Sequence, residues 1–263
     1  MAGFPASSTR FSNSAGTVTT RIDSPLTGSA PLLFTGGNFI LGGNNTSLSG
    51  PVTLLSPFGI TSNNNAVGTG ILTLGASNNV FIYALDGDRT IGNNVIFAGN
   101  RMVINNTDLG TGLTVGNLTI DGNLALNGTG PADLFLRKSL TVNGVVSGSN
   151  SNIGLLLASN SGIIKLTHAG NNFTGKITWA VGSTVEADSN GALGALANNL
   201  RFNVSGSLKM LASCDSARAI VIANNAAGAA GANTTLAQCN TNGFDSTWTG
   251  TISAPVFAVP ATA

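Results

Sequence analysis

The feature that most constrains this chain is that its apolar residues occur in short alternating runs, each closed by Gly, Asn, Ser or Pro. The stretch from 162 to 194, GIIKLTHAGNNFTGKITWAVGSTVEADSNGALG, shows the pattern best. Large side chains alternate with small or polar ones in IIKL, ITWAV and TVEA, which is the period of a strand. Gly and Asn between the runs favour tight corners. Strands this short are unstable alone, so the pattern predicts units that stack on one another.

Runs of the same kind continue along the whole chain. We count about two dozen, among them PLLFT, NFIL, VFIYAL, LTI, LFL, SLKML and VFAV. At three strands per coil they predict an all-β solenoid, a right-handed parallel β-helix of about eight to ten coils. No linker-like change in composition divides the chain, so residues 1–263 are predicted to form a single domain.

Composition supports an ordered chain with little helix. Charged residues make up only 8% and hydrophobic residues 42%, whereas disordered chains combine high charge with low hydrophobicity. Gly accounts for 35 of 263 residues, and both Gly and Asn are unfavourable inside helices.

The alternation also predicts which side chains point inward. The most regular segment, LTVGNLTIDGNLALNG, repeats GNL after six residues. Together with the runs that follow, it places these residues in inward stacks: Leu118, Ile120, Leu124, Leu126, Leu155, Leu157, Ile164, Leu166, Ile177 and Val185.

Asparagine pairs recur at the corners, for example at 44–45, 93–94, 171–172 and 198–199. The simpler interpretation is that each occupies a left-handed corner conformation. The alternative is that some stack between coils as amide ladders.

The stretch GNNFTGKITWAVGSTVEADSNGALG resembles the strand repeat of bacterial autotransporter passenger domains, the autotransporter-associated beta strand repeat. The matching positions are Asn172, Phe173, Thr174, Gly175, Val185, Ala192, Leu193 and Gly194. The chain departs from the usual repeat at Lys176 and Trp179, where the family has a second Gly and a run of Thr. Weaker similarity covers 88–99, 113–128 and 247–254. The resemblance implies a β-helix outside the cell that serves as a stalk, display surface or adhesin, without chemistry.

Two cysteines, Cys214 and Cys239, flank an Ala-rich stretch. An even number in a chain that looks exported favours one disulfide between them, and the alternative is two buried free thiols. Two Cys and one His offer no metal-ligand spacing, so no metal site is expected.

Charge and hydropathy restrict the classes of partner that the chain is expected to bind. The net charge is +1 with no Lys/Arg cluster, which disfavours nucleic-acid binding. Gly, Asn and Pro interrupt every apolar run, so no membrane-spanning helix is predicted. The N-terminus, MAGFPASSTRFSNSAG, does not have the pattern of a signal peptide. An extracellular or cell-surface location is expected, with the leader not present in this chain.

Candidate catalytic residues are few, and no cofactor is expected. His168 lies in a corner without a Ser-His-Asp context, and Glu186 is the sole glutamate. Asp86 and Asp88 form the closest acidic pair and are expected to brace a loop, with Arg89 as a partner, because the calcium repeat GGxGxD is absent. The segment GTGLTVG is Gly-rich but lacks the following Lys of a phosphate-binding loop. A polysaccharide-cleaving β-helix enzyme is therefore the least favoured function, and we expect no enzymatic activity.

The functional hypothesis is based on the two ends of the chain. Residues 1–30 and 247–263 are predicted to be terminal strands, poor in charge and without a helical cap. We expect a structural subunit that joins copies of itself head to tail in a filament, with an adhesin rod that contacts a cell surface or glycan as the alternative. The expected interface residues are Val18, Ile22, Trp248, Ile252, Val256, Phe257 and Val259.

Overall fold

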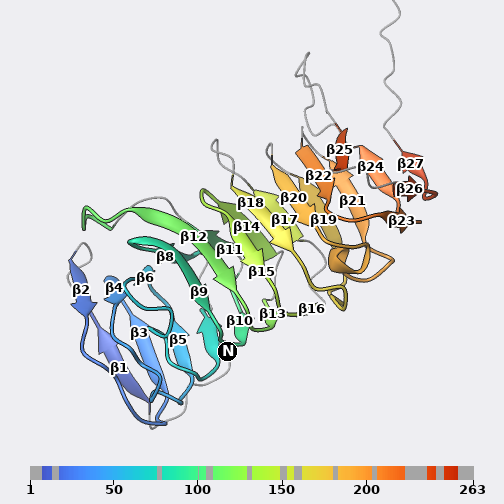
Figure 1. Ribbon diagram of the computed structural model, residues 1–263. Helices are drawn as coiled ribbons and strands as arrows, with labels where there is room; N and C mark the ends of the chain where they lie inside the picture. The colour runs from blue at the N-terminus through green and yellow to red at the C-terminus, as the bar shows by residue number, and fades with distance from the viewer. Residues whose placement is uncertain are drawn as a thin grey trace, which may run out of the picture.

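The computed structural model describes residues 8–13, 18–75, 79–99, 101–104, 109–128, 132–148, 153–156, 162–179, 183–202, 206–222, 236–240 and 246–253. These residues form 27 strands and one 3-10 helix, η1 (Gly191–Leu193), and helix amounts to 2% of the described residues. The strands stack as a parallel β-solenoid of about 8 turns, which confirms the predicted fold class. Figure 1 shows the strands following one axis, from β1 at the blue end to β27 at the red end.

Three long sheets form the walls of the solenoid. In strand order, sheet 1 contains β1 (Thr9–Ser12), β3 (Leu32–Thr35), β5 (Val52–Leu54), β7 (Leu72–Leu74), β10 (Val95–Phe97), β13 (Leu124–Leu126) and β16 (Val146–Gly148). Sheet 2 contains β2 (Thr19–Ile22), β4 (Asn38–Leu41), β6 (Phe58–Ile60), β8 (Asn79–Ala84), β11 (Arg101–Ile104), β14 (Ala132–Leu136), β17 (Ile153–Leu156), β19 (Lys176–Trp179), β21 (Asn199–Phe202), β24 (Ile220–Ile222) and β27 (Ile252–Ser253). Sheet 3 contains β9 (Gly87–Ile91), β12 (Val115–Ile120), β15 (Leu140–Val142), β18 (Ile163–Leu166), β20 (Thr184–Ala187), β22 (Gly206–Met210) and β25 (Leu236–Asn240). A separate pair joins β23 (Cys214–Ser216) to β26 (Ser246–Trp248).

Sheet 2 has 11 strands and the other two long sheets have seven each, because coils at both ends contribute to sheet 2 without supplying a strand to every other sheet. The third wall of the first coils is a corner in which Gly28 bridges Leu48. Beyond β16, sheet 1 is continued by corner segments: Asn172 and Thr174 donate backbone hydrogen bonds to Val146 and Gly148. The walls therefore change from strand to corner while the coil-to-coil hydrogen bonding continues.

The repeat-like residues of 162–194 form one packing unit. Phe173, Val185, Ala192 and Leu193 are buried in the core. Gly194 has a φ of 79°, and a Cβ there would lie 2.7 Å from the Phe173 ring. The closing Gly is thus required both by backbone conformation and by contact with the corner phenylalanine. At the position where the sequence departs from the repeat, Trp179 is fully buried and stacks on Phe202, with ring centroids 4.1 Å apart.

The predicted inward stacks are confirmed for eight residues: Leu118, Ile120, Leu124, Leu126, Ile164, Leu166, Ile177 and Val185 are all buried. The side chain of Leu155 and the whole of Leu157 lie outside the described residues. Parallel register aligns the stacks, for example Leu118 with Leu140 and Leu140 with Ile164. Each inward position of one coil therefore rests on an inward position of the next.

The preferred interpretation of the Asn pairs is wrong for the described residues. The non-Gly residues with positive φ are Ser62, Asp86 and Leu109, and none of them is an asparagine. Instead, one member of a pair is buried and bonds to neighbouring coils, as Asn45, Asn93, Asn171 and Asn198 do. These side chains satisfy backbone groups that the corner leaves unpaired, so their bonds join side chain to backbone and do not form the amide-to-amide stacks of the alternative.

The predicted disulfide finds no support in the structure. Cys214 is a buried free cysteine on β23. Cys239 lies on β25 in register with Lys209, whose ammonium faces outward to Glu186 at 3.0 Å. The side chain of Cys239 lies outside the described residues. The two cysteines belong to different sheets, and burial raises the pKa of the Cys214 thiol.

Candidate functional site

The N-terminal end presents β1 and β2, each paired on one side only among the described residues. Phe11 of β1 stacks on Phe34 with ring centroids 4.9 Å apart, so the core reaches the end of the rod. Arg21 and Asp23 form an exposed ion pair at 2.8 Å. Because these charges neutralise each other, Arg10 is the one remaining charge on the described part of β1 and β2.

The C-terminal end presents β25, β26 and β27, again each paired on one side within the described chain. The described residues of β26 and β27 carry no charge. The Nε1 atom of Trp248 is buried and has no hydrogen-bond partner among these residues. A buried donor without an acceptor is costly, so an acceptor from outside the described residues would stabilise this end.

The predicted interface residues divide into three groups. Val18 and Ile252 are 54% and 62% exposed, as an interface requires. Ile22 and Trp248 are partly buried and pack against the core of their own chain. Val256, Phe257 and Val259 lie outside the described residues.

The residues considered for catalysis have structural partners instead. His168 is an exposed turn residue whose Nδ1 accepts a hydrogen bond from Gly170 at 2.9 Å. Glu186 pairs with Lys209, and Asp88 accepts the backbone N–H of Asn117 at 2.7 Å. Arg89 reaches the carbonyl of Leu85 and lies 3.7 Å from the Asp86 carboxylate, so it braces this loop. Within the described residues, no cluster of His, Cys, Asp or Glu could hold a metal ion.

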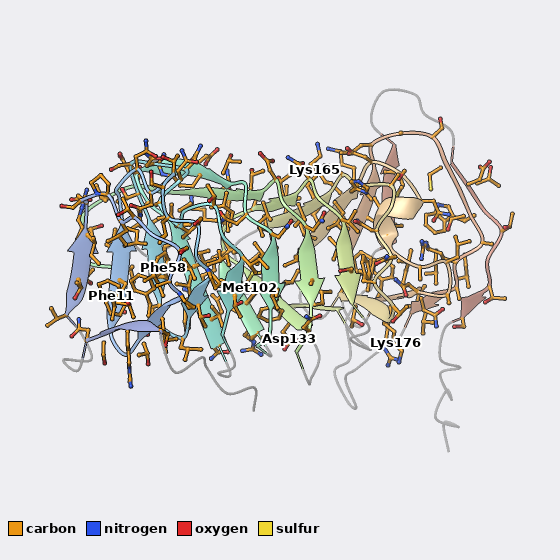
Figure 2. The ribbon with its side chains drawn as sticks, turned by 90° about the horizontal axis from the view of Figure 1, so that it is seen from below. Phe11, Phe58, Met102, Asp133, Lys165 and Lys176 are labelled. Carbon is orange, nitrogen blue, oxygen red and sulfur yellow. The ribbon has the colours of Figure 1, made fainter. Side chains whose placement is uncertain are left out.

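The interior of the central coils offers no room for a ligand. The space lined by Leu124, Leu166, Val185 and their neighbours has a volume of about 10 Å³. That volume holds at most one water molecule. Figure 2 shows side chains such as Phe58 and Met102 within the rod. Any binding site in this part of the chain must therefore lie on the outer surface.

A strap formed by residues 109–115 covers part of the outer face of sheet 2. Leu109, Leu113 and Val115 pack against the outward-facing Ile40 and Tyr83. At its far end, the Leu109 carbonyl accepts a hydrogen bond from the hydroxyl of Thr19 on β2. In Figure 1 this green segment begins above the blue strands β2 and β4 and leads into β12. The Gly-rich GTGLTVG sequence is thus part of a covering segment.

Beyond the strap, the same face carries a groove of about 210 Å³. It is lined by Asn79, Phe81, Arg101, Val103, Phe135 and Arg137, from β8, β11 and the end of β14. Phe81 and Phe135 both stand in register with Val103, so the smaller Val103 forms the floor between two rings. This site was not predicted from the sequence. A signal was present, because Phe81 and Phe135 occupy outward positions of VFIYAL and LFL, where alternation calls for polar residues.

The groove combines positive charge with aromatic surface. The guanidinium carbons of Arg101 and Arg137 lie 5.9 and 5.5 Å from the centroid of the Phe135 ring. Arg101 also pairs with Asp133 at 3.4 Å. Burial raises the pKa of Asp133, although the hydrogen bond and charge of Arg101 act in the opposite direction. The carboxylate is therefore only partly compensated by its partner.

Comparisons with known proteins name no relative: no family model, curated protein or solved structure matches the chain. No helix in the described part of the chain is long and apolar enough to span a bilayer. The function is therefore inferred from the solenoid and its surfaces.

Proposed function

We propose that the protein is a non-enzymatic structural subunit of an extracellular or cell-surface assembly, in which copies join end to end through their terminal strands. The observation that carries this proposal is that β2 and β27 are the two outer strands of the same sheet. All strand pairs of sheet 2 are parallel, so β27 of one copy and β2 of the next run in the same direction. Adding one to the other repeats the pairing already used within the chain.

The composition of both ends agrees with such a contact. Native edge strands usually carry charges, proline or a covering helix that block pairing with other chains. Here the described part of β26 and β27 has no charge, and the pair formed by Arg21 and Asp23 is internally neutral. Exposed Val18 and Ile252 add apolar contact area at opposite ends. A head-to-tail contact of this kind is heterologous and generates an open filament when its rotation does not close a ring.

Negative-stain microscopy of the purified chain tests the proposal. The intact chain should form filaments, and deletion of residues 247–263 should abolish them. Ile252→Lys should also block assembly, because it places an unpaired charge in the strand-to-strand contact. Leu196→Lys is the matched control, since Leu196 is 70% exposed on a lateral corner away from the ends. Filaments that persist in the deletion or in Ile252→Lys, or an intact chain that stays monomeric at high concentration, would rule out end-to-end assembly.

The alternative is an adhesin rod that works as a monomer or from a tether on the cell. The lateral groove between Phe81 and Phe135 favours it, because a structural spacer has no need of a charged aromatic surface. A monomeric chain that nevertheless binds a ligand at this groove would select the rod over the filament.

A further inference from the structure

The outer face of sheet 2 is covered by the strap along one part of its length and uncovered along another. Over β4 and β8 the apolar side chains of Ile40 and Tyr83 are covered by the strap. Phe81 lies at the boundary, since it contacts this covered cluster and also lines the groove. Beyond it, Phe135 is only partly buried. The apolar surface thus continues past the segment that covers it, and its uncovered part coincides with the two arginines.

The spacing of the rings is set by the sheet. Phe81 and Phe135 are separated by one intervening strand, so their backbones lie about 10 Å apart across two strand spacings. Both rings are held on rigid, paired strands. A ligand with repeating flat apolar faces could place one face against each ring and pass over Val103 between them.

The charges of the groove favour an anion. Arg101, Arg137 and Asp133 sum to one positive charge. The Nε atom of Arg101 is buried and has no hydrogen-bond partner within the described residues. Arg137 is exposed, and its guanidinium forms no ion pair with a carboxylate in the described chain. A guanidinium matches the geometry of a carboxylate, with which it forms two parallel hydrogen bonds.

We propose that this groove binds an acidic polysaccharide, with sugar ring faces against Phe81 and Phe135 and sugar carboxylates paired with Arg137 and Arg101. A chain of uronate units has a flat face of C–H groups on each sugar ring and a carboxylate on the same unit. The C–H face can pack on the phenylalanine rings, and the carboxylate can pair with the arginines. The site is lateral and lies between the ends, so it is independent of end-to-end assembly.

Two other macromolecules fit less well. A peptide that adds a strand needs a free sheet edge, but β11 is already paired on both sides, with β8 and β14. Nucleic acid requires several phosphate contacts, whereas the groove has two arginines and the whole chain a net charge of +1. Aromatic surface with few charges therefore favours a carboxylated sugar chain.

The test measures binding of the full chain to alginate oligosaccharides by calorimetry, with carboxyl-reduced alginate and poly-L-glutamate as comparison ligands. Alginate should bind, and both comparison ligands should bind at least about tenfold more weakly, because one lacks the charge and the other the ring faces. Arg137→Gln and Phe135→Ala should each weaken alginate binding by about tenfold or more. Lys176→Gln is the control: it removes a positive charge from the same side of the rod, where Figure 2 places Lys176 and Asp133, without touching the groove.

Asp133→Asn gives an independent readout that does not depend on loss of binding. It removes the negative charge of the groove and releases Arg101, so alginate affinity should rise several-fold and depend more steeply on salt. Absence of alginate binding, equal binding of the reduced polymer, or tighter binding of poly-L-glutamate would overturn the proposal. Equal losses in Lys176→Gln and Arg137→Gln would also overturn it, because they would indicate diffuse attraction to the whole face.

Discussion

At the scale of single residues, Arg218 is the most unusual feature of the described chain. Its side chain is almost fully buried, and it donates to the carbonyls of Asn190 and Gly194 at 2.9 and 2.7 Å and to the side chain of Asn190 at 2.8 Å. It also donates to the carbonyls of Ala195 and Asn198. Burial lowers the pKa of Arg218, because loss of solvent disfavours the charged guanidinium, although the charge of the nearby Cys214 acts in the opposite direction. One guanidinium thus satisfies the inward-facing carbonyls of a whole corner, from 190 to 198.

Arg218 has two opposing effects on stability: burying its charge is unfavourable, and the hydrogen bonds that it donates are favourable. Arg218→Met relieves the desolvation of a charge but leaves several buried carbonyl oxygens without a donor, and each such acceptor costs about 1 to 3 kcal/mol. We expect a net loss of about 2 to 3 kcal/mol in urea-unfolding free energy. Lys176→Met is the control and should change stability little, since Lys176 is exposed. If Arg218→Met has the same urea-unfolding free energy as the parent protein, the hydrogen bonds of this corner are not needed for stability.

At the scale of elements, the corners are connected by asparagine side chains rather than by backbone conformation alone. Asn171 accepts from the backbone N–H of Val146 in the preceding coil at 2.7 Å and donates to the carbonyl of Ala192 in the following coil at 2.8 Å. On the outside, Asn94 accepts from the backbone of Asn123, which in turn accepts from that of Val145. Each side chain therefore links one coil to the next where strand pairing stops.

The pair at 171–172 provides a matched experiment. Asn171→Ala leaves a buried donor and a buried acceptor unpaired in two neighbouring coils, so we expect a loss of about 2 kcal/mol. Asn172→Ala changes the same residue type one position away, where the side chain is exposed, and should cost less than about 0.5 kcal/mol. Differential scanning calorimetry of both variants measures the difference. Equal melting temperatures would show that the hydrogen bonds of Asn171 to the neighbouring coils contribute nothing to stability.

At the scale of the whole molecule, each interior coil is stabilised by the coils on both sides of it. The central strands β10 to β15 have neighbours on two sides, whereas β1, β2 and β27 are paired on one side only among the described residues. In a one-dimensional stack of this kind, end units open more readily than interior ones.

Amide hydrogen exchange followed by mass spectrometry should show this gradient. In dilute monomer, amides of β2 and β27 should exchange faster than those of β11 and β14, because their edges lack a partner strand. In filaments, exchange at both ends should slow toward the interior rate, and because few charges are involved, this protection should persist at high salt. Terminal amides that are equally protected in monomer and filament would show that another part of the chain makes the contact.

Much of this structure could be predicted from local pattern. Alternation in IIKL, TVEA and LAL determined strand position and inward register, since a shift by one residue would bury polar side chains and expose Leu and Ile. The scarcity of charge and the abundance of Gly and Asn determined the fold class. These properties depend on neighbours in sequence, and a single chain displays them directly.

Tertiary structure decided what depends on residues distant in sequence. Asn171 and Asn172 are adjacent residues of the same type, but the side chain of Asn171 bonds to backbone groups of adjacent coils and that of Asn172 is exposed to solvent. The groove exists because Phe81, Val103 and Phe135, from three different coils, come into register on a face that the strap does not cover. Cys214 is likewise buried on a strand of one sheet, whereas Cys239 lies on a strand of another sheet. The distance between the two cysteines in the sequence does not show this separation. Coil-to-coil register brings these residues together or keeps them apart, and it is set by the stacking of all coils at once.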